Sequence, residues 1–161
     1  MINLNDVNYK YNDTAAQAIQ HISLSVKKGE LVAITGKSGC GKTTVFRCMN
    51  GLCPRFYEGE INGTLTLNGK ALSSMRICDI SNIAASVFQN PESQFFTTDV
   101  LSDLVYPCEN CGIEKEEIQE RLYRVTKLLS LEPLLNRKLS ELSGGEKQKI
   151  AIASVLMLDT R

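Results

Sequence analysis

The chain has 161 residues, a length typical of one domain that buries its own hydrophobic core. Eighteen Lys and Arg residues balance eighteen Asp and Glu residues. This neutrality argues against nucleic acid as a partner, because such binding is dominated by phosphate neutralisation. No apolar stretch reaches the length of a membrane span, and the first residues do not resemble a secretory signal. We therefore expect a cytosolic protein unless a partner holds it at a membrane.

The sequence pattern of the N-terminal third predicts strands, a loop and then a helix. Apolar residues in the ranges 2–9 and 22–26 indicate two strands, the second of them half exposed. Residues 30–35 (ELVAIT) form a short β-branched run bounded by glycines, which predicts a buried strand. Residues 43–50 then place apolar side chains at helical spacing, and Gly51 is a typical residue after a helix end.

Between that strand and that helix lies GKSGCGKT, which matches the phosphate-loop pattern G-x-x-x-x-G-K-[ST]. Its glycines lack a Cβ, so the backbone can approach phosphate oxygens closely and point N–H groups at them. Lys42 suits the β- and γ-phosphates of a nucleotide, and the Thr43 hydroxyl suits Mg²⁺. The alternative is a glycine-rich turn with an unrelated lysine. The candidate ATP-binding residues of the loop are Gly36, Lys37, Ser38, Gly39, Cys40, Gly41, Lys42, Thr43 and Thr44.

The rest of the chain predicts a hairpin, a short strand and helices. Residues 59–72 predict a second antiparallel region, in which polar and apolar residues alternate over 64–67 before an Asn68-Gly69 turn. Residues 86–89 predict a short strand, and residues 98–135 are helical in pattern, most clearly over 114–129.

Near the C-terminus, LSGGEKQ precedes an apolar run. Ser143 with Glu146 three residues later is a capping box, so the segment predicts a helix start. Two glycines in the first turn leave the amides accessible to an anion. By spacing alone, an ordinary capped helix explains the same residues.

LSGGEKQ as a whole resembles the signature motif of ABC-type ATPases, and other positions agree. Tyr11 is similar to the family's aromatic residue that stacks on adenine, with a plain strand-end tyrosine as the alternative. Gln89 resembles the glutamine that reaches Mg²⁺ and the attacking water. QNPESQFFTTDV resembles the ATPases of energy-coupling factor (ECF) transporters, and GLCPRFYEGEINGTLTLNGK resembles the first half of their tandem two-domain forms.

The resemblance implies an α/β fold for the whole chain. It consists of a P-loop core with a mostly parallel sheet, an N-terminal antiparallel β subdomain and a helical subdomain over about 90–145. The function it implies is that of the ATP-binding subunit of an ECF-like importer of a micronutrient, with ATP and Mg²⁺ as cofactors. Thr43 and Gln89 would hold the metal.

The resemblance also implies partners. ABC ATPase domains pair head to tail, as homodimers, heterodimers or tandem halves, and bind an integral membrane subunit at the cytoplasmic face of the membrane. Each domain closes over its partner's ATP with its signature residues, which here are Ser143, Gly144, Gly145, Glu146 and Gln148.

The sequence departs from the family after the signature. The family's next strand ends in Asp-Glu, for Mg²⁺ and the attacking water, and a histidine follows later. Asp159 comes too soon after the signature to end such a strand, and Thr160 is not Glu. No catalytic residue is therefore visible, and we expect a C-terminally truncated domain that does not hydrolyse ATP alone. Two alternatives are a non-catalytic remnant and a soluble ABC ATPase unconnected with transport.

Overall fold

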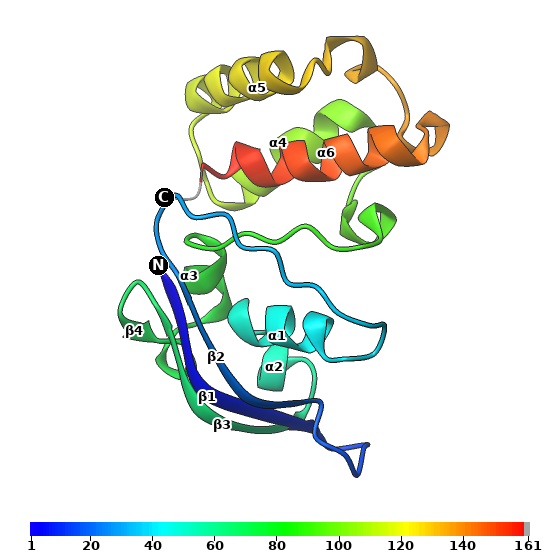
Figure 1. Ribbon diagram of the computed structural model, residues 1–161. Coiled ribbons are helices and arrows are strands. Elements are labelled where there is room, and N and C mark those ends of the chain that lie inside the picture. The colour runs from blue at the N-terminus through cyan, green and yellow to red at the C-terminus, as the bar shows by residue number, and fades with distance from the viewer. Residues whose placement is uncertain (160–161) are drawn as a thin grey trace. The chain divides into compact units, whose positions relative to one another are not determined.

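The computed structural model describes residues 1–159 and contains two compact units, Met1–Ala84 and Ala85–Arg161 (Figure 1). Among the described residues, no helix has both the length and the apolar character needed to cross a lipid bilayer.

The first unit is built on a four-stranded antiparallel sheet with the order β2-β1-β3-β4. Its strands are β1 (Ile2–Tyr11), β2 (Ile19–Val26), β3 (Gly59–Leu67) and β4 (Lys70–Ala71). In β1, Leu4 lies opposite Leu24 of β2 on one side and Leu65 of β3 on the other. The predicted hairpin is confirmed: Asn68 and Gly69 adopt φ values of 48° and 80°, as a tight turn between twisted strands requires.

Short helices contribute to the core of this unit. They are α1 (Lys42–Met49), α2 (Leu52–Arg55), the 3-10 turn η1 (Leu72–Ser74) and α3 (Ile77–Ser81). Val45 and Cys48 of α1 and Ile80 of α3 are buried in one cluster with Val7 and Leu67 of the sheet. The predicted helix over 43–50 is confirmed by α1, which ends before Gly51 in the left-handed region at φ 75°.

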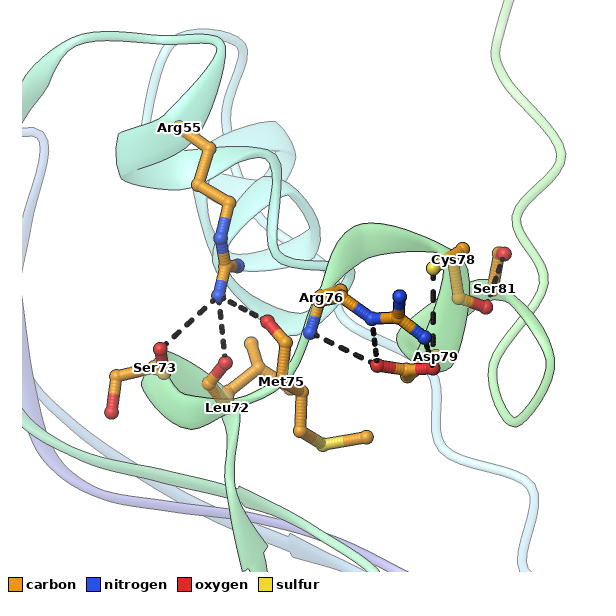
Figure 2. Close-up of polar contacts among 8 residues, drawn as sticks. All are labelled: Arg55, Leu72, Ser73, Met75, Arg76, Cys78, Asp79 and Ser81. Atoms are coloured by element: carbon orange, nitrogen blue, oxygen red, sulfur yellow. Dashed lines mark hydrogen bonds and ion pairs between the residues drawn. The ribbon is translucent and has the colours of Figure 1, made fainter.

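Arg55 fixes the segment that follows the hairpin. Its Nη2 donates to the carbonyl oxygens of Leu72 at 2.9 Å and Met75 at 2.7 Å (Figure 2). Its Nη1 donates to the carbonyl oxygen of Gly51 at 3.1 Å. The Arg55 guanidinium is thus held by main-chain carbonyl oxygens and not by a carboxylate among these contacts. At the start of α3, Arg76 pairs with Asp79 on the surface, with Nε and Oδ2 3.0 Å apart.

The strands predicted at 30–35 and 86–89 are not formed. Residues 30–37 and 84–88 belong to no helix or strand, and the Leu31 side chain is 98% exposed. A strand exists only when a neighbouring strand pairs with it, and within residues 1–159 all the sheet pairing involves β1 to β4. The apolar run therefore lies extended and unpaired, so the described residues contain no parallel ladder.

The second unit is helical, as the sequence pattern indicates. Its elements are η2 (Pro91–Gln94), α4 (Val100–Asn110), α5 (Lys115–Leu129), η3 (Glu132–Leu134), η4 (Leu139–Glu141) and α6 (Gly144–Met157). Figure 1 shows α6 running beside α4, and the apolar side chains of Leu104, Ile150 and Ala153 meet in the core of this unit. The buried Asp103 accepts from the N–H groups of Phe96 and Thr97, which fixes the chain entering α4. Burial raises the pKa of this carboxyl despite those two bonds.

Candidate functional site

The phosphate loop leads directly into α1, whose N-terminus carries no side-chain cap. Gly41 occupies the N-cap position at φ 93° and ψ 0°, and no side chain accepts a hydrogen bond from the first turn. The first N–H groups of a helix have no partner inside the helix, and the helix dipole makes this end positive. The loop therefore presents a helix end suited to an anion.

Glycine is required at Gly41 by close packing as well as by conformation. A Cβ there would lie 2.5 Å from the Ala18 carbonyl oxygen and 2.7 Å from Ile19 Cγ2. Gly39, at φ 80°, has nothing within 4 Å of its Cβ position, so only its backbone conformation favours glycine. The loop is thus packed against the start of β2 at Gly41 and has no close neighbour at the Cβ position of Gly39.

The Lys42 side chain turns back across the loop. Its Nζ donates to the carbonyl oxygens of Gly36 at 2.9 Å and Lys37 at 2.7 Å, and lies 3.7 Å from Cys40 Sγ. Lys37, Ser38 and Cys40 are exposed. The acceptors that hold the Lys42 ammonium group are neutral carbonyl oxygens, and phosphate oxygens would be stronger acceptors.

Tyr11 lies beside the same loop, although the two are 25 or more residues apart in sequence. A hollow of about 230 Å³ is lined by Tyr11, Ala18, Gly39, Gly41, Lys42, Thr43 and Thr44. The Tyr11 hydroxyl lies 3.0 Å from Thr44 Oγ1 and accepts from Arg47 Nη1 at 3.1 Å. The fold therefore brings the candidate adenine-stacking residue to the candidate phosphate site.

The two candidate metal ligands occupy different units. Thr43 lies in the first turn of α1, is exposed, and lines the hollow beside Lys42. Its hydroxyl oxygen is a ligand type that Mg²⁺ accepts together with nucleotide phosphates. Gln89 is an exposed residue of the second unit, in the bend before η2.

The signature segment begins α6 with the predicted capping box, which is confirmed. Glu146 Oε2 accepts from the Ser143 N–H and hydroxyl, both at 2.7 Å, and the Glu146 N–H points to Ser143 Oγ at 3.4 Å. The hydrogen bond from the Ser143 backbone N–H lowers the pKa of the Glu146 carboxyl, helped by the Ser143 side chain and by Arg137. Gly144, Gly145 and Gln148 are exposed.

Helix α6 ends at Met157, and Asp159 follows it in the left-handed region at φ 48°. Asp159 pairs with Arg124 at 3.6 Å between Oδ2 and Nη2. Thr160, the position where the sequence lacks the family's Glu, lies outside the described residues.

Two contacts were not foreseen from the sequence. Arg47 of α1 bonds the Tyr11 hydroxyl and lies 3.7 Å above the centre of the Tyr57 ring. Lys147, within the signature, forms an ion pair with Glu92 of η2. The available signal for Arg47 was its place one helical turn after Thr43, which puts it on the same side of α1 as the loop's end.

Comparison with known proteins gives a family and close relatives. The family model described as ABC transporter matches residues 19–161. A putative ABC transporter ATP-binding protein of Treponema denticola is 95% identical over the whole chain, which spans 33% of that relative's length. A putative ABC transporter ATP-binding protein of Pyrococcus abyssi is 38% identical over 98% of the chain, which covers 56% of that protein.

Two solved structures are similar in fold. One is cbiO1 from Clostridium perfringens, described as part of the ABC transporter complex cbiONQ, with a TM-score of 0.84 and 29% identity over 98% of this chain and 61% of that one. The other is an ATP-binding cassette in a dimeric post-hydrolysis state with ADP and Pi, with a TM-score of 0.80 and 25% identity over 99% of this chain and 70% of that one. These likenesses confirm the predicted α/β class with a P-loop core.

Proposed function

Because the chain belongs to the ABC transporter ATP-binding family, we propose that it provides an ATP-binding part of an ECF-type importer of a micronutrient. The observation that carries this proposal is the shared hollow, where Tyr11, Lys42 and Thr43 converge from two elements. The likeness to cbiO1, described as part of the complex cbiONQ, supports the transporter type, as does the segment QNPESQFFTTDV.

Lys42, Thr43 and Tyr11 have distinct tasks in this proposal. Lys42 exchanges its carbonyl contacts for the β- and γ-phosphate oxygens, and the loop and first-turn amides bind the remaining oxygens. Thr43, together with Gln89, supplies oxygen ligands to Mg²⁺. Tyr11 stacks on the adenine. The metal contributes charge neutralisation of the phosphates when it is bound.

The signature residues serve a second nucleotide. We assign Ser143, Gly144 and Gly145, with Glu146 and Gln148 behind them, to the ATP of a partner domain. The dimeric state of the related cassette with ADP and Pi supports a paired arrangement. The partner is a second ABC ATPase domain, in a homodimer, a heterodimer or a tandem chain. An integral membrane subunit then holds the pair at the cytoplasmic face of the membrane.

The residues assigned here bind and position a nucleotide, and none of them is a general base. ATP binding is therefore the proposed property of these 161 residues by themselves, while hydrolysis and transport belong to the complete assembly. A hydrolysis assay on the purified chain tests this division: phosphate release at the rate of an assembled transporter would overturn it.

Binding is tested with Lys42→Ala, measured by calorimetric titration with ATP and Mg²⁺. Loss of a charge-assisted contact to phosphate weakens binding by about 10- to 100-fold. Lys28→Ala is the matched control, because Lys28 is an exposed lysine in a turn of the same unit, outside the hollow. Equal affinity of the two variants would refute the nucleotide site. Failure of the complete protein to co-purify with any membrane subunit would refute the transport role.

A further inference from the structure

We propose that Arg47 is a positioning residue for nucleotide recognition, which holds the Tyr11 ring ready for adenine and takes no part in binding phosphate. This inference rests on the proposed ATP site and assigns a role that the loop motif does not include. Arg47 lies in α1, which begins at the phosphate loop, and its Nη1 donates to the Tyr11 hydroxyl at 3.1 Å.

Tyr11 is the last residue of β1, where it pairs with Gly59 of β3, and the chain leaves the sheet directly after it. Residues 12–17 after it are exposed and lie outside regular structure. A side chain at such a place loses conformational entropy on binding a ligand unless contacts already fix it. Arg47 and Thr44, both from α1, fix its hydroxyl from the side of the phosphate loop.

Arg47 is itself fixed by an aromatic ring. Its guanidinium carbon lies 3.7 Å from the centre of the Tyr57 ring, a distance suited to a cation–π contact. The Tyr57 carbonyl oxygen accepts from the Tyr9 hydroxyl, and the Tyr9 and Tyr11 rings meet edge to face with centroids 4.9 Å apart. Four residues thus form a closed circuit of contacts: Tyr11, Arg47, Tyr57 and Tyr9.

The circuit joins parts of the unit that the sequence separates. Tyr9 and Tyr11 belong to β1, Arg47 to α1, and Tyr57 to the segment between α2 and β3. The place of the adenine-binding ring is therefore set relative to α1, the helix whose N-terminus receives the phosphates. A nucleotide that bridges the two subsites finds them already at a fixed separation, which lowers the entropic cost of binding.

The test compares ATP with inorganic tripolyphosphate, which offers the phosphates without the base. In calorimetric titrations of the full chain, Arg47→Ala weakens ATP binding by about two- to tenfold, the cost of ordering one side chain. Its affinity for tripolyphosphate stays unchanged. Arg47→Lys, which keeps a donor but loses the flat cation over Tyr57, falls between the two.

A double-mutant cycle shows whether Arg47 acts through Tyr11. If it does, Arg47→Ala has no further effect on ATP affinity in a Tyr11→Ala background. Arg76→Ala is the control for losing a guanidinium, since Arg76 is an exposed arginine of the same unit that pairs with Asp79 (Figure 2). It leaves both affinities unchanged.

The outcomes separate the two proposals. Equal weakening of ATP and tripolyphosphate by Arg47→Ala, unchanged ATP affinity, or an undiminished effect in the Tyr11→Ala background would each overturn the role of Arg47. The proposed nucleotide site would stand in all three cases. An unsubstituted chain that binds neither ligand would refute the nucleotide site itself, and the inference with it.

Discussion

Two helices of the chain begin at glycine-rich segments, and their N-termini differ in capping. Helix α1 follows Gly41 without a side-chain cap, has no acidic residue in its first turn, and carries the Lys42 cation at its first position. Helix α6 begins at Ser143 with a complete capping box, in which the Glu146 carboxylate takes the Ser143 donors. The first start thus has no carboxylate in its own first turn, whereas in the second the Glu146 carboxylate already accepts from the Ser143 N–H and hydroxyl.

The glycines of the two helix starts also differ in whether their surroundings require glycine. A Cβ at Gly41 would strike the Ala18 carbonyl, so the packing of the unit itself demands glycine. A Cβ at Gly144 or Gly145 meets nothing within 4 Å among the described residues. Neither the surroundings nor a positive φ demands glycine at these two positions. This difference is consistent with a signature whose glycines leave room for the nucleotide of another domain. Substitutions at the two helix starts should therefore have different effects.

Gly41→Ala has the largest expected effect. The substitution places a Cβ 2.5 Å from a backbone oxygen at a φ of 93°, so the loop must move. We expect a loss of about 2 kcal/mol or more in the free energy of unfolding, together with weaker ATP binding. Chemical denaturation and calorimetric titration measure the two quantities. A variant with the stability and ATP affinity of the parent would show that the loop is not held against Ala18.

Ser143→Ala removes the cap of α6 and is expected to cost about 1 kcal/mol of stability. Helix content followed by circular dichroism during urea unfolding reports this loss. Because Ser143 belongs to the second unit and the phosphate loop to the first, tripolyphosphate binding to Lys42 should remain as it was. A matched Ser81→Ala, at the end of α3, removes a hydroxyl that donates to the Cys78 carbonyl and should cost less.

Gly144→Ala should act in the opposite direction to Gly41→Ala. An alanine in the first turn of α6 meets no neighbour and restricts the unfolded chain, so stability rises by about 0.5–1 kcal/mol. If the signature serves a partner's nucleotide, the same substitution lowers ATP-dependent pairing of domains, which size-exclusion chromatography can follow. A loss of stability would mean that Gly144 serves the fold of its own unit.

The smallest expected effect is the pH dependence of the α6 cap. The pKa of Glu146 is lowered in the folded chain, so its contribution is complete above the ordinary glutamate pKa and is lost as the pH falls below it. The melting temperatures of the parent and of Glu146→Gln should therefore differ at pH 6 and converge towards pH 3. A constant difference across that range would show that the carboxylate charge plays no part in the cap.

Local chemistry made much of this molecule predictable. The glycines and Lys42 indicate a loop before a helix, Asn68 with Gly69 indicates a hairpin, and Ser143 with Glu146 indicates a cap. Each of these structures is closed by residues a few positions apart, and each is present. The apolar run at 30–35 is different, because a strand requires partners that lie far away in sequence, and none among residues 1–159 pairs with it.

The contacts of Tyr11 show the same limit at the level of side chains. The sequence suggests an aromatic residue near a nucleotide, but its neighbours Thr44 and Arg47 come from a helix more than thirty residues later. Their closeness depends on how β1 packs against α1 around Val45 and Cys48. Periodicity predicts which face of α1 is buried, and it does not state which tyrosine lies at the edge of that face.

The unpaired segment 30–37 offers a way to detect by hydrogen exchange when another strand pairs with it. Amide hydrogens outside helices and sheets exchange with solvent far faster than those in a paired strand. The amides of β1, which pairs with β2 on one side and β3 on the other, already have strand neighbours. Whatever provides a strand neighbour for residues 30–37 will slow deuterium uptake there while leaving β1 nearly unchanged. Mass-spectrometric exchange at this one peptide would thus record when the core next to the phosphate loop is completed.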